Sequence, residues 1–286
     1  MAPQLVSQSR PRIGVWLFPS APAGALVEAI EAAEEAGLDE VWLADEGVAR
    51  EPMTVLAAAS QRTKRIRLGV GVTSPVVRHP AMIAATAATL DELSGGRAVL
   101  GLGVGGHLTL GPLGLNLSKP TKVLTDGIRI ARAVLAGAET DGYSPPDHHF
   151  PRPRVPVWVG ARGPKLTTIA ADQADGLFLS GCTQEEHETI ISRVRSRSQT
   201  PIAIYQSAQE QPRHNDDYRG QRSPRASNWD TISLVLDDAR LRHQPAALGI
   251  NLIDLNPSPE RRGQPPVPAE LVTRAATILS TQLFRR

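Results

Sequence analysis

The sequence predicts a single α/β domain, residues 1–286, in which eight parallel strands close into a (β/α)8 barrel, the TIM-barrel architecture. Short apolar runs bounded by turn residues alternate with amphipathic segments of helical length, a pattern typical of a parallel sheet with helical crossovers. The runs are apolar throughout, as in residues 13–18, and strands buried on both faces have this character. A chain of 286 residues has the length at which such a barrel closes as one domain.

The apolar runs give eight candidate strands, the number that closes the barrel. They are residues 13–18, 41–44, 66–72, 98–102, 157–159, 176–179, 202–205 and 250–255. The first helix follows strand one, because Leu26, Ile30 and Ala33 share one face and Gly37 then supplies a C-terminal stop. Further helices are expected at residues 80–93, 119–136, 184–197 and 268–284.

Three segments depart from this alternation. Residues 1–12 are expected to form a flexible N-terminus, and the proline-rich residues 137–156 a loop that leads into the fifth strand. Residues 206–228 are nearly devoid of aliphatic side chains and carry four arginines, which predicts a polar loop after strand seven. Because this loop would lie on the catalytic face of the barrel, it is expected to be either a disordered segment or a lid.

The composition is that of an ordinary globular protein, with 41% hydrophobic and 21% charged residues. The single cysteine, Cys182, excludes an intrachain disulfide, and residues 1–12 lack the apolar core of a secretory signal, so a cytoplasmic location is expected. No apolar run has the length needed to span a bilayer, which argues against a membrane protein. The net charge of +2 is dispersed along the chain, which argues against a nucleic-acid partner.

Functional residues of a parallel barrel lie where its strands end, so those positions are the first candidates for chemistry. Strand two is followed by Asp45 and Glu46, two adjacent carboxylates suited to proton exchange. The alternative is that one of them caps the next helix or pairs with Arg50. Strand three carries Gly69 and Gly71, and glycines within a buried strand mark either a bulge beside a ligand or tight packing inside the barrel.

A glycine-rich stretch follows strand four and ends at His107. Gly105 and Gly106 do not form a dinucleotide-binding turn, which would open a helix directly, whereas a further loop follows here. His107 can titrate near neutral pH and act as an acid or base, and the alternative is a solvated loop histidine. His148 and His149 with Asp147 suggest a metal, but they lie in a proline-rich loop and the only cysteine, Cys182, is far away in the sequence, so no metal site is expected.

The junction after strand five has the features of an anion site. Backbone N–H groups, a helix N-terminus and two cations converge there, which is the combination that a phosphate needs. Ser180 and Gly181 close strand six and add a hydroxyl and a close backbone approach from the neighbouring position. The residues of the turn are Gly160, Ala161, Arg162, Gly163, Pro164 and Lys165.

Several of these segments together resemble the luciferase-like monooxygenase superfamily. They are residues 66–75, 78–80, 90–97, 100–105, 157–165 and 174–176. The likeness runs from about residue 13 to residue 181, and beyond residue 184 it is only architectural. Within the superfamily the sequence looks closest to the coenzyme F420-dependent oxidoreductases, which include proteins similar to methylene-tetrahydromethanopterin reductase.

The resemblance implies coenzyme F420 as the cofactor, with FMN as the alternative, its ring across the barrel mouth and its phosphate at the ends of strands five and six. It also implies a non-proline cis peptide between Gly71 and Val72 behind the ring. A small-molecule substrate and a second copy of the chain, giving a homodimer, are the expected partners. The residues expected to bind the cofactor are Asp45, Gly71, Val72, Thr73, Gly105, Gly106, Gly160, Ala161, Arg162, Gly163, Pro164, Ser180 and Gly181.

The sequence departs from the superfamily's sugar-phosphate and alcohol dehydrogenases at two places. Those proteins have a histidine where Glu46 stands, and a glutamate follows their strand-four glycines where Gly105 and Gly106 stand here. The departures favour a reductase that transfers hydride from reduced deazaflavin to an activated C=C or C=N bond. Glu46 is then the principal proton donor, His107 the second candidate and Asp45 an anchor. The alternatives are an FMN-dependent monooxygenase and a non-catalytic barrel whose cofactor site has decayed.

Overall fold

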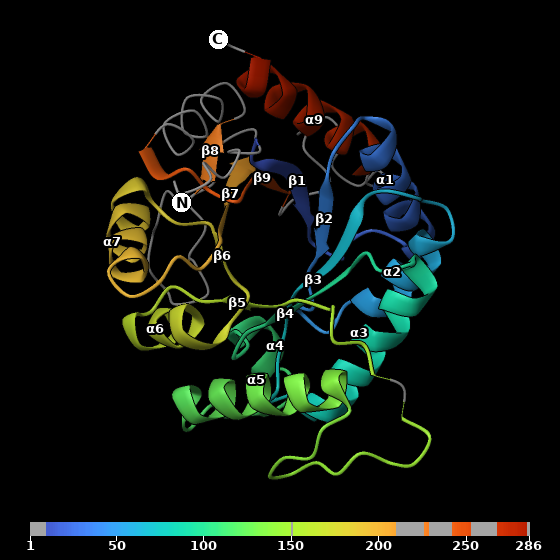
Figure 1. Ribbon diagram of the computed structural model, residues 1–286. Coiled ribbons are helices and arrows are strands. Elements are labelled where there is room, and N and C mark those ends of the chain that lie inside the picture. Colours follow the sequence, from blue (N-terminus) through green and yellow to red (C-terminus); the bar gives the residue numbers. More distant parts are fainter. Residues whose placement is uncertain (1–9, 150, 210–225, 229–241, 253–267, 285–286) are drawn as a thin grey trace, which may run out of the picture.

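The structure, a computed structural model, describes residues 10–149, 151–209, 226–228, 242–252 and 268–284. Eight parallel strands form a closed barrel in the order β1–β2–β3–β4–β5–β6–β7–β9, with β9 paired back to β1 (Figure 1). The short β8 pairs with the end of β7. The strands are β1 Arg12–Leu17, β2 Glu40–Leu43, β3 Arg67–Thr73, β4 Ala98–Leu102, β5 Val157–Gly160, β6 Gly176–Ser180, β7 Ile202–Gln209, β8 Ala226–Asn228 and β9 Ala247–Leu252.

Helices surround the barrel and begin at residues whose chemistry favours a helix start. Proline occupies the first helical turn of α2, α3, α5 and α6, where its missing N–H group costs nothing. Thr183 and Glu186 form a reciprocal capping box at the start of α7. The helices are α1 Ala23–Glu35, α2 Pro52–Ser60, α3 Pro80–Ser94, α4 His107–Leu110, α5 Pro120–Ala136, α6 Pro164–Gln173, α7 Gln184–Arg195 and α9 Pro268–Phe284.

The barrel confirms the predicted fold class, and the largest difference in an element concerns β7. This strand continues to Gln209, and β8 takes residues 226–228, so both ends of the segment predicted as a polar loop are extended strand. Gln206 and Ser207 are buried and lie opposite Ile250 and Asn251 of β9, so one polar side chain on each face of the strand interrupts the apolar pattern. Residues 210–225 lie outside the described part of the chain, and the lid stays a prediction.

Smaller differences occur at the two ends of the chain. β1 begins at Arg12, inside the segment expected to be flexible, and Arg10 forms an ion pair with Asp39 at 2.7 Å. Residues 1–9 are outside the described residues. β9 begins at Ala247, three residues before the predicted start, and residues 253–255 of that prediction are also outside the described part.

Aromatic side chains fill the barrel interior, and glycines on neighbouring strands leave room for them. Trp42, Trp158, Phe178 and Tyr205 are buried in one cluster. A Cβ atom at Gly176 would lie 2.4 Å from the Trp158 ring, far inside van der Waals contact. The glycines are therefore part of the packing that fixes these rings.

At the amino-terminal end of the barrel, the buried carboxylate of Glu40 has four partners. Its Oε1 accepts hydrogen bonds from Trp42 Nε1 and Tyr205 Oη, both at 2.9 Å. Its Oε2 accepts from Arg12 at 2.7 Å and from Arg67 at 3.3 Å. Burial, followed by the Glu40 charge and hydrogen bond, raises the pKa of Tyr205 well above its ordinary value, so its hydroxyl stays a donor. The network satisfies a charge whose burial would otherwise be costly.

Within the described residues, no helix is both long and apolar enough to cross a membrane.

Acid stability depends on His187 of α7, whose exposed fraction is 3%. Burial, aided by the nearby charge of His243, lowers the pKa of His187 from 6.5 to about 4. In the unfolded chain the His187 imidazole therefore binds a proton as the pH falls below 6.5, whereas in the folded protein it binds one only near pH 4. We expect this residue to remove about 3 kcal/mol of stability between those pH values, with the loss growing as the pH falls.

Urea unfolding at a series of pH values measures this dependence. His187→Leu is expected to flatten the slope between pH 6.5 and 4, whereas His148→Gln, at an exposed loop histidine, retains the wild-type slope. An unchanged slope in the His187 variant would show that other groups dominate acid unfolding.

Candidate active site

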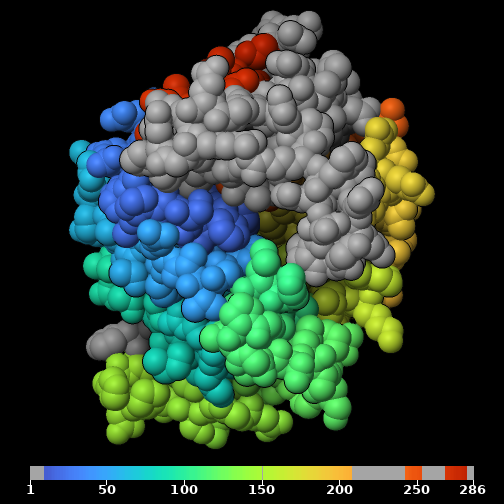
Figure 2. Space-filling model, turned by 180° about the vertical axis from the view of Figure 1, so that it is seen from behind, coloured from blue at the N-terminus to red at the C-terminus, as the bar shows by residue number. Residues whose placement is uncertain are grey.

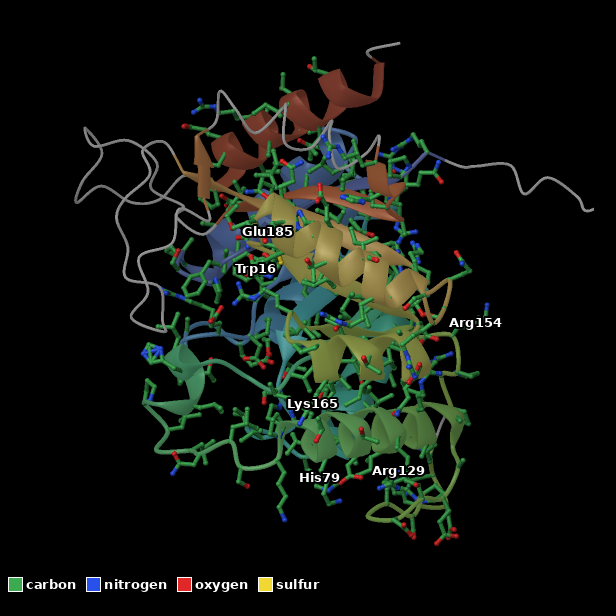
Figure 3. The ribbon with its side chains drawn as sticks, turned by 90° about the vertical axis from the view of Figure 1, so that its left-hand side faces the viewer. Trp16, His79, Arg129, Arg154, Lys165 and Glu185 are labelled. Carbon is green, nitrogen blue, oxygen red and sulfur yellow. The ribbon has the colours of Figure 1, made fainter. Side chains whose placement is uncertain are left out.

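The strands open at their carboxyl ends onto one face of the barrel, and the predicted site residues lie around that opening. Figure 2 shows this face, with a hollow beside the green segment that follows β4. Figure 3 shows Trp16 of β1 and Lys165 at the start of α6 from the side.

The bulge predicted in β3 is present. The peptide bond between Gly71 and Val72 is cis, and the pairing with β4 shifts register between Val70 and Thr73. Trp16 of β1 donates from Nε1 to the Gly71 carbonyl oxygen at 2.5 Å, which connects the bulge to β1, two strands away in the barrel. The predicted cis bond and bulge are confirmed.

The side chain of Val72 projects from this bulge toward glycines of the next two strands. A Cβ atom at Gly103 would lie 2.5 Å from Val72 Cγ2, and one at Gly160 would lie 2.8 Å from Val72 Cγ1. At Gly69 and Gly71, the strand glycines for which two explanations were offered, a Cβ atom would lie 2.5 Å and 2.9 Å from the Trp42 ring, so tight packing and the bulge are both present there, and the ligand beside the bulge stays a prediction. Gly160, expected at the cofactor, is explained by this contact with Val72.

Asp45 is held against the same bulge. Thr73, which is fully buried, donates from Oγ1 to Asp45 Oδ2 at 2.5 Å. Burial raises the pKa of Asp45, and the hydrogen bond from Thr73 opposes that shift. Asp45 does not cap the next helix, because Glu51 is the N-cap of α2 and accepts from Thr54 N.

Glu46 lies near residues from two other rim loops. Burial raises the pKa of its carboxyl, and Arg162 first and His107 second oppose the shift as nearby positive charges. Its Oε1 lies beside the Gly106 backbone, 3.5 Å from the position of a Cβ atom built there. Arg162 also reaches the Gly181 carbonyl oxygen at 3.5 Å. Residues predicted separately after β2, β4 and β5 are thus brought together.

A hydrogen bond between a backbone N–H group and a side chain connects the loop that contains Glu46 to the segment after β4. Gly47 donates from its N–H group to Thr109 Oγ1 at 3.1 Å, which joins the segment after β2 to α4. Gly105 has φ +83°, a left-handed conformation that glycine adopts without a steric penalty.

The turn after β5 has the form expected of an anion site. Gly163 is the N-cap of α6 and contributes no capping side chain, and Pro164 follows at the first helical position. A Cβ atom at Gly163 would have no heavy atom within 4 Å, so the approach to the helix N-terminus is open. Lys165 is exposed next to it. Such an N-terminus favours a negative charge through its N–H groups and dipole.

Asn251 of β9 contacts a predicted site residue, and sequence reasoning did not single it out. It is 5% exposed, and its Nδ2 donates to Ser180 Oγ at the end of β6. The available signal was a lone amide near the carboxyl end of an otherwise apolar strand. Ser180 therefore has a partner in addition to the phosphate expected there.

Within the described ranges, no group of three or more His, Cys, Asp or Glu side chains is arranged to hold a metal ion. His149 instead lies 3.4 Å from the Tyr143 hydroxyl.

The chain belongs to the luciferase-like monooxygenase family, whose sequence profile matches residues 5–275. This confirms the resemblance found in the sequence. A 5,10-methylenetetrahydromethanopterin reductase of Methanolobus tindarius is 31% identical over 187 residues, which cover 63% of this chain and 57% of that protein. An F420-dependent glucose-6-phosphate dehydrogenase of Microbacterium testaceum is 36% identical over 163 residues, which cover 50% of this chain and 48% of that protein.

The chain thus spans about half the length of the curated relatives it matches. Among solved structures, the coenzyme F420-dependent tetrahydromethanopterin reductase of Methanopyrus kandleri superposes with a TM-score of 0.72 at 20% sequence identity. The superposition covers 93% of this chain and 98% of that one, which confirms the barrel fold.

Proposed function

We propose that the protein is a coenzyme F420-dependent reductase that transfers hydride to an activated C=C or C=N bond of a small organic substrate. The observation that carries this proposal is the position of Glu46, a half-buried carboxyl at the barrel mouth that lies near Arg162 and His107 and whose pKa is raised by burial. The family and the reductase relative support the class of chemistry.

The residues around the mouth fit such a cofactor. Gly106 places no side chain beside the Glu46 carboxyl, and the open N-terminus of α6 with Arg162 and Lys165 suits a phosphate. The amide oxygen of Asn251 is buried with no hydrogen-bond partner in the described structure, as expected of an atom that meets a ligand. When bound, the reduced deazaflavin supplies the hydride.

The chain's own residues then complete the reduction. Hydride addition to one atom of a polarised double bond leaves an electron pair on the other, and Glu46 donates its proton to that atom. The Arg162 and His107 charges stabilise the carboxylate that remains, as their lowering effect on the Glu46 pKa indicates. Solvent returns a proton to Glu46 before the next turnover. Asp45, which accepts a hydrogen bond from Thr73 beside the bulge, serves to hold the cofactor or the substrate in place.

Glu46→Gln is expected to lower the rate of hydride transfer by about 10²–10⁴-fold while leaving F420 affinity within about twofold, because general acid help contributes factors of that size. The measurement is single-turnover oxidation of bound, reduced F420 by a panel of enones and cyclic imines. Since the protonated carboxyl is the active form, the wild-type rate should fall as the pH rises through the Glu46 pKa. Glu92→Gln, on the outer surface, is the control.

His107→Ala is expected to have the smaller effect. If the Glu46 and His107 variants each keep most of the wild-type rate, the proton comes from water or from the substrate, and both roles are wrong.

Gly163→Trp is expected to weaken F420 binding tenfold or more, about 1.4 kcal/mol, because the new side chain covers the open N-terminus of α6. Gly163→Ala is the matched control, since φ at this position is −69° and a Cβ atom there meets nothing within 4 Å. Fluorescence titration gives both affinities, and thermal unfolding checks that each variant is folded. If a folded Gly163→Trp protein binds F420 with wild-type affinity, the phosphate does not bind at this turn. Binding of FMN instead of F420 would favour the monooxygenase alternative.

We also propose that the protein is a homodimer formed through the outer faces of α2 and α3. An outer helix of a barrel ordinarily carries charged residues on its solvent side. α2 has no charged residue, and α3 has only Asp91 and Glu92 near its end, while Met82 and Leu93 are 60% and 48% exposed. A second copy of the same face would cover these side chains.

Sedimentation over a concentration series is expected to show a wild-type dimer. Met82→Glu should shift it to monomer, whereas Thr277→Glu on the exposed side of α9 should not. A Met82→Glu protein that remains dimeric places the interface elsewhere.

A further inference from the structure

Three apolar side chains stand on loops that meet at Gly47. The Gly47 N–H group donates to Thr109 Oγ1 at 3.1 Å, and a Cβ atom built on Gly47 would lie 3.5 Å from Phe18 Cζ. Val48 and Leu108 are the chain neighbours of the two hydrogen-bonded residues, and since successive Cα atoms are about 3.8 Å apart, they flank this junction. Phe18, Val48 and Leu108 are called the apolar patch below.

The apolar patch is open to solvent. Val48 is 59% exposed and Leu108 41%, and Phe18 is partly exposed. Single exposed apolar side chains are ordinary on a protein surface, whereas several on adjoining loops mark a place where something binds.

The backbone at Val48 is strained. Gly47 and Val48 both have left-handed φ values, +74° and +49°. Glycine adopts this conformation without a penalty, but in a β-branched residue it is an outlier that costs on the order of 1–3 kcal/mol. The exposed Val48 side chain gains little from packing within the chain, so the strain is better explained by a contact with a ligand.

The apolar patch lies next to the proposed proton donor. Val48 follows Glu46 by two residues, and Leu108 follows Gly106 by two. A Cβ atom at Gly106 would lie 3.5 Å from Glu46 Oε1, so both ends of the patch begin beside this carboxyl. A molecule whose reducible bond reaches Glu46 therefore extends its substituents over the patch.

The surroundings of the apolar patch offer little to a charged substituent. Residues 104–118 contain no Asp, Glu, Lys or Arg and a single histidine. In the loop after β2, Arg50 reaches the Ser20 carbonyl oxygen at 3.4 Å, and Glu51 forms an ion pair with Arg78 at 3.0 Å. The patch therefore suits an uncharged carbon skeleton, which loses no hydration of a charge on binding.

We propose that the apolar patch binds an alkyl substituent of the hydride acceptor, so that the substrate is an uncharged enone or imine with an apolar chain and not a sugar phosphate. The proposal rests on the proposed function for the reaction, whereas the contact itself needs only the patch. Each methylene that the patch covers should tighten binding about two- to fourfold, since full burial of one contributes about 0.8 kcal/mol.

Two matched ligand series test the apolar patch. Saturated 2-alkylcyclohexanones, from methyl to butyl, report binding by calorimetry, with and without oxidised F420. The corresponding 2-alkylcyclohexenones report hydride transfer through oxidation of reduced F420. For the wild type, the affinity of the ketones and kcat/KM of the enones are both expected to rise about two- to fourfold with each methylene.

Isosteric variants separate apolar contact from shape. Val48→Asn and Leu108→Asn are expected to abolish the dependence on chain length, because an amide replaces the apolar contact. Val48→Leu, which has the shape of asparagine but is apolar, is expected to retain it. Asparagine adopts a left-handed conformation more readily than leucine, so Val48→Asn should unfold at a temperature no lower than Val48→Leu. A loss of affinity then cannot be attributed to a loss of fold.

The outcomes distinguish the two proposals. Ketone binding that depends on chain length, with no hydride transfer to any enone, overturns the proposed function and supports the apolar patch. Hydride transfer that is independent of chain length overturns the patch alone, as does a wild-type dependence in Val48→Asn. If Val48→Asn changes the sedimentation of the protein and not its affinity for ketones, the patch is an interface between copies and the proposal is wrong. A wild type that binds no ketone and reduces no enone overturns both.

Discussion

Contact between large aromatic rings and glycines on neighbouring strands determines what else the barrel can hold. Tyr205 occupies space that side chains at Gly14 and Gly249 would fill, and a Cβ atom at Gly249 would lie 2.2 Å from its ring. Trp42 has the same relation to Gly69 and Gly71, with a Cβ atom at Gly69 only 2.5 Å from its ring. Because interiors are close-packed, neither partner in such a contact can change alone without a shift of the strands.

The placement of these rings divides the barrel into two chemically different ends. At the amino-terminal end, Trp42 and Tyr205 turn their polar atoms onto Glu40, and the carboxylate is fully hydrogen-bonded. At the carboxyl end, Trp16 donates a hydrogen bond to the Gly71 carbonyl oxygen, and the residues around the mouth beyond it are mostly polar. The aromatic layer between them separates a satisfied structural charge from the residues proposed to react, so a change in protonation at the rim has little reason to disturb the opposite end.

The fold class and most strands could be predicted from the sequence, because each buried strand of the barrel appears in it as an apolar run. Glu46, His107 and Arg162 were found by their positions after strands, although their proximity depends on loop paths that no spacing encodes. Asn251 and the extension of β7 were missed for one physical reason. A polar side chain that faces inward interrupts the apolar pattern, and its partner, here Ser180, is 71 residues away in the chain. The strand glycines were ambiguous since bulge and packing leave the same sequence signal.

Two neighbouring carboxyls at the mouth have raised pKa values that packing alone does not require, whereas Tyr205 and His187, whose pKa values are also shifted, are almost fully buried. Burial raises the pKa of both Asp45 and Glu46, although an exposed rim could have solvated either carboxyl. The Asn251 amide oxygen, one residue before the end of β9, has no hydrogen-bond partner among the described residues, while at the other end of the barrel the Glu40 carboxylate has four. Local departures from satisfied polar chemistry are tolerated where binding a ligand repairs them, because the energy lost in the free protein is regained in the complex. The same strands therefore serve two purposes. Their amino-terminal ends carry polar groups that stabilise the fold, and their carboxyl ends carry the groups proposed to bind a ligand.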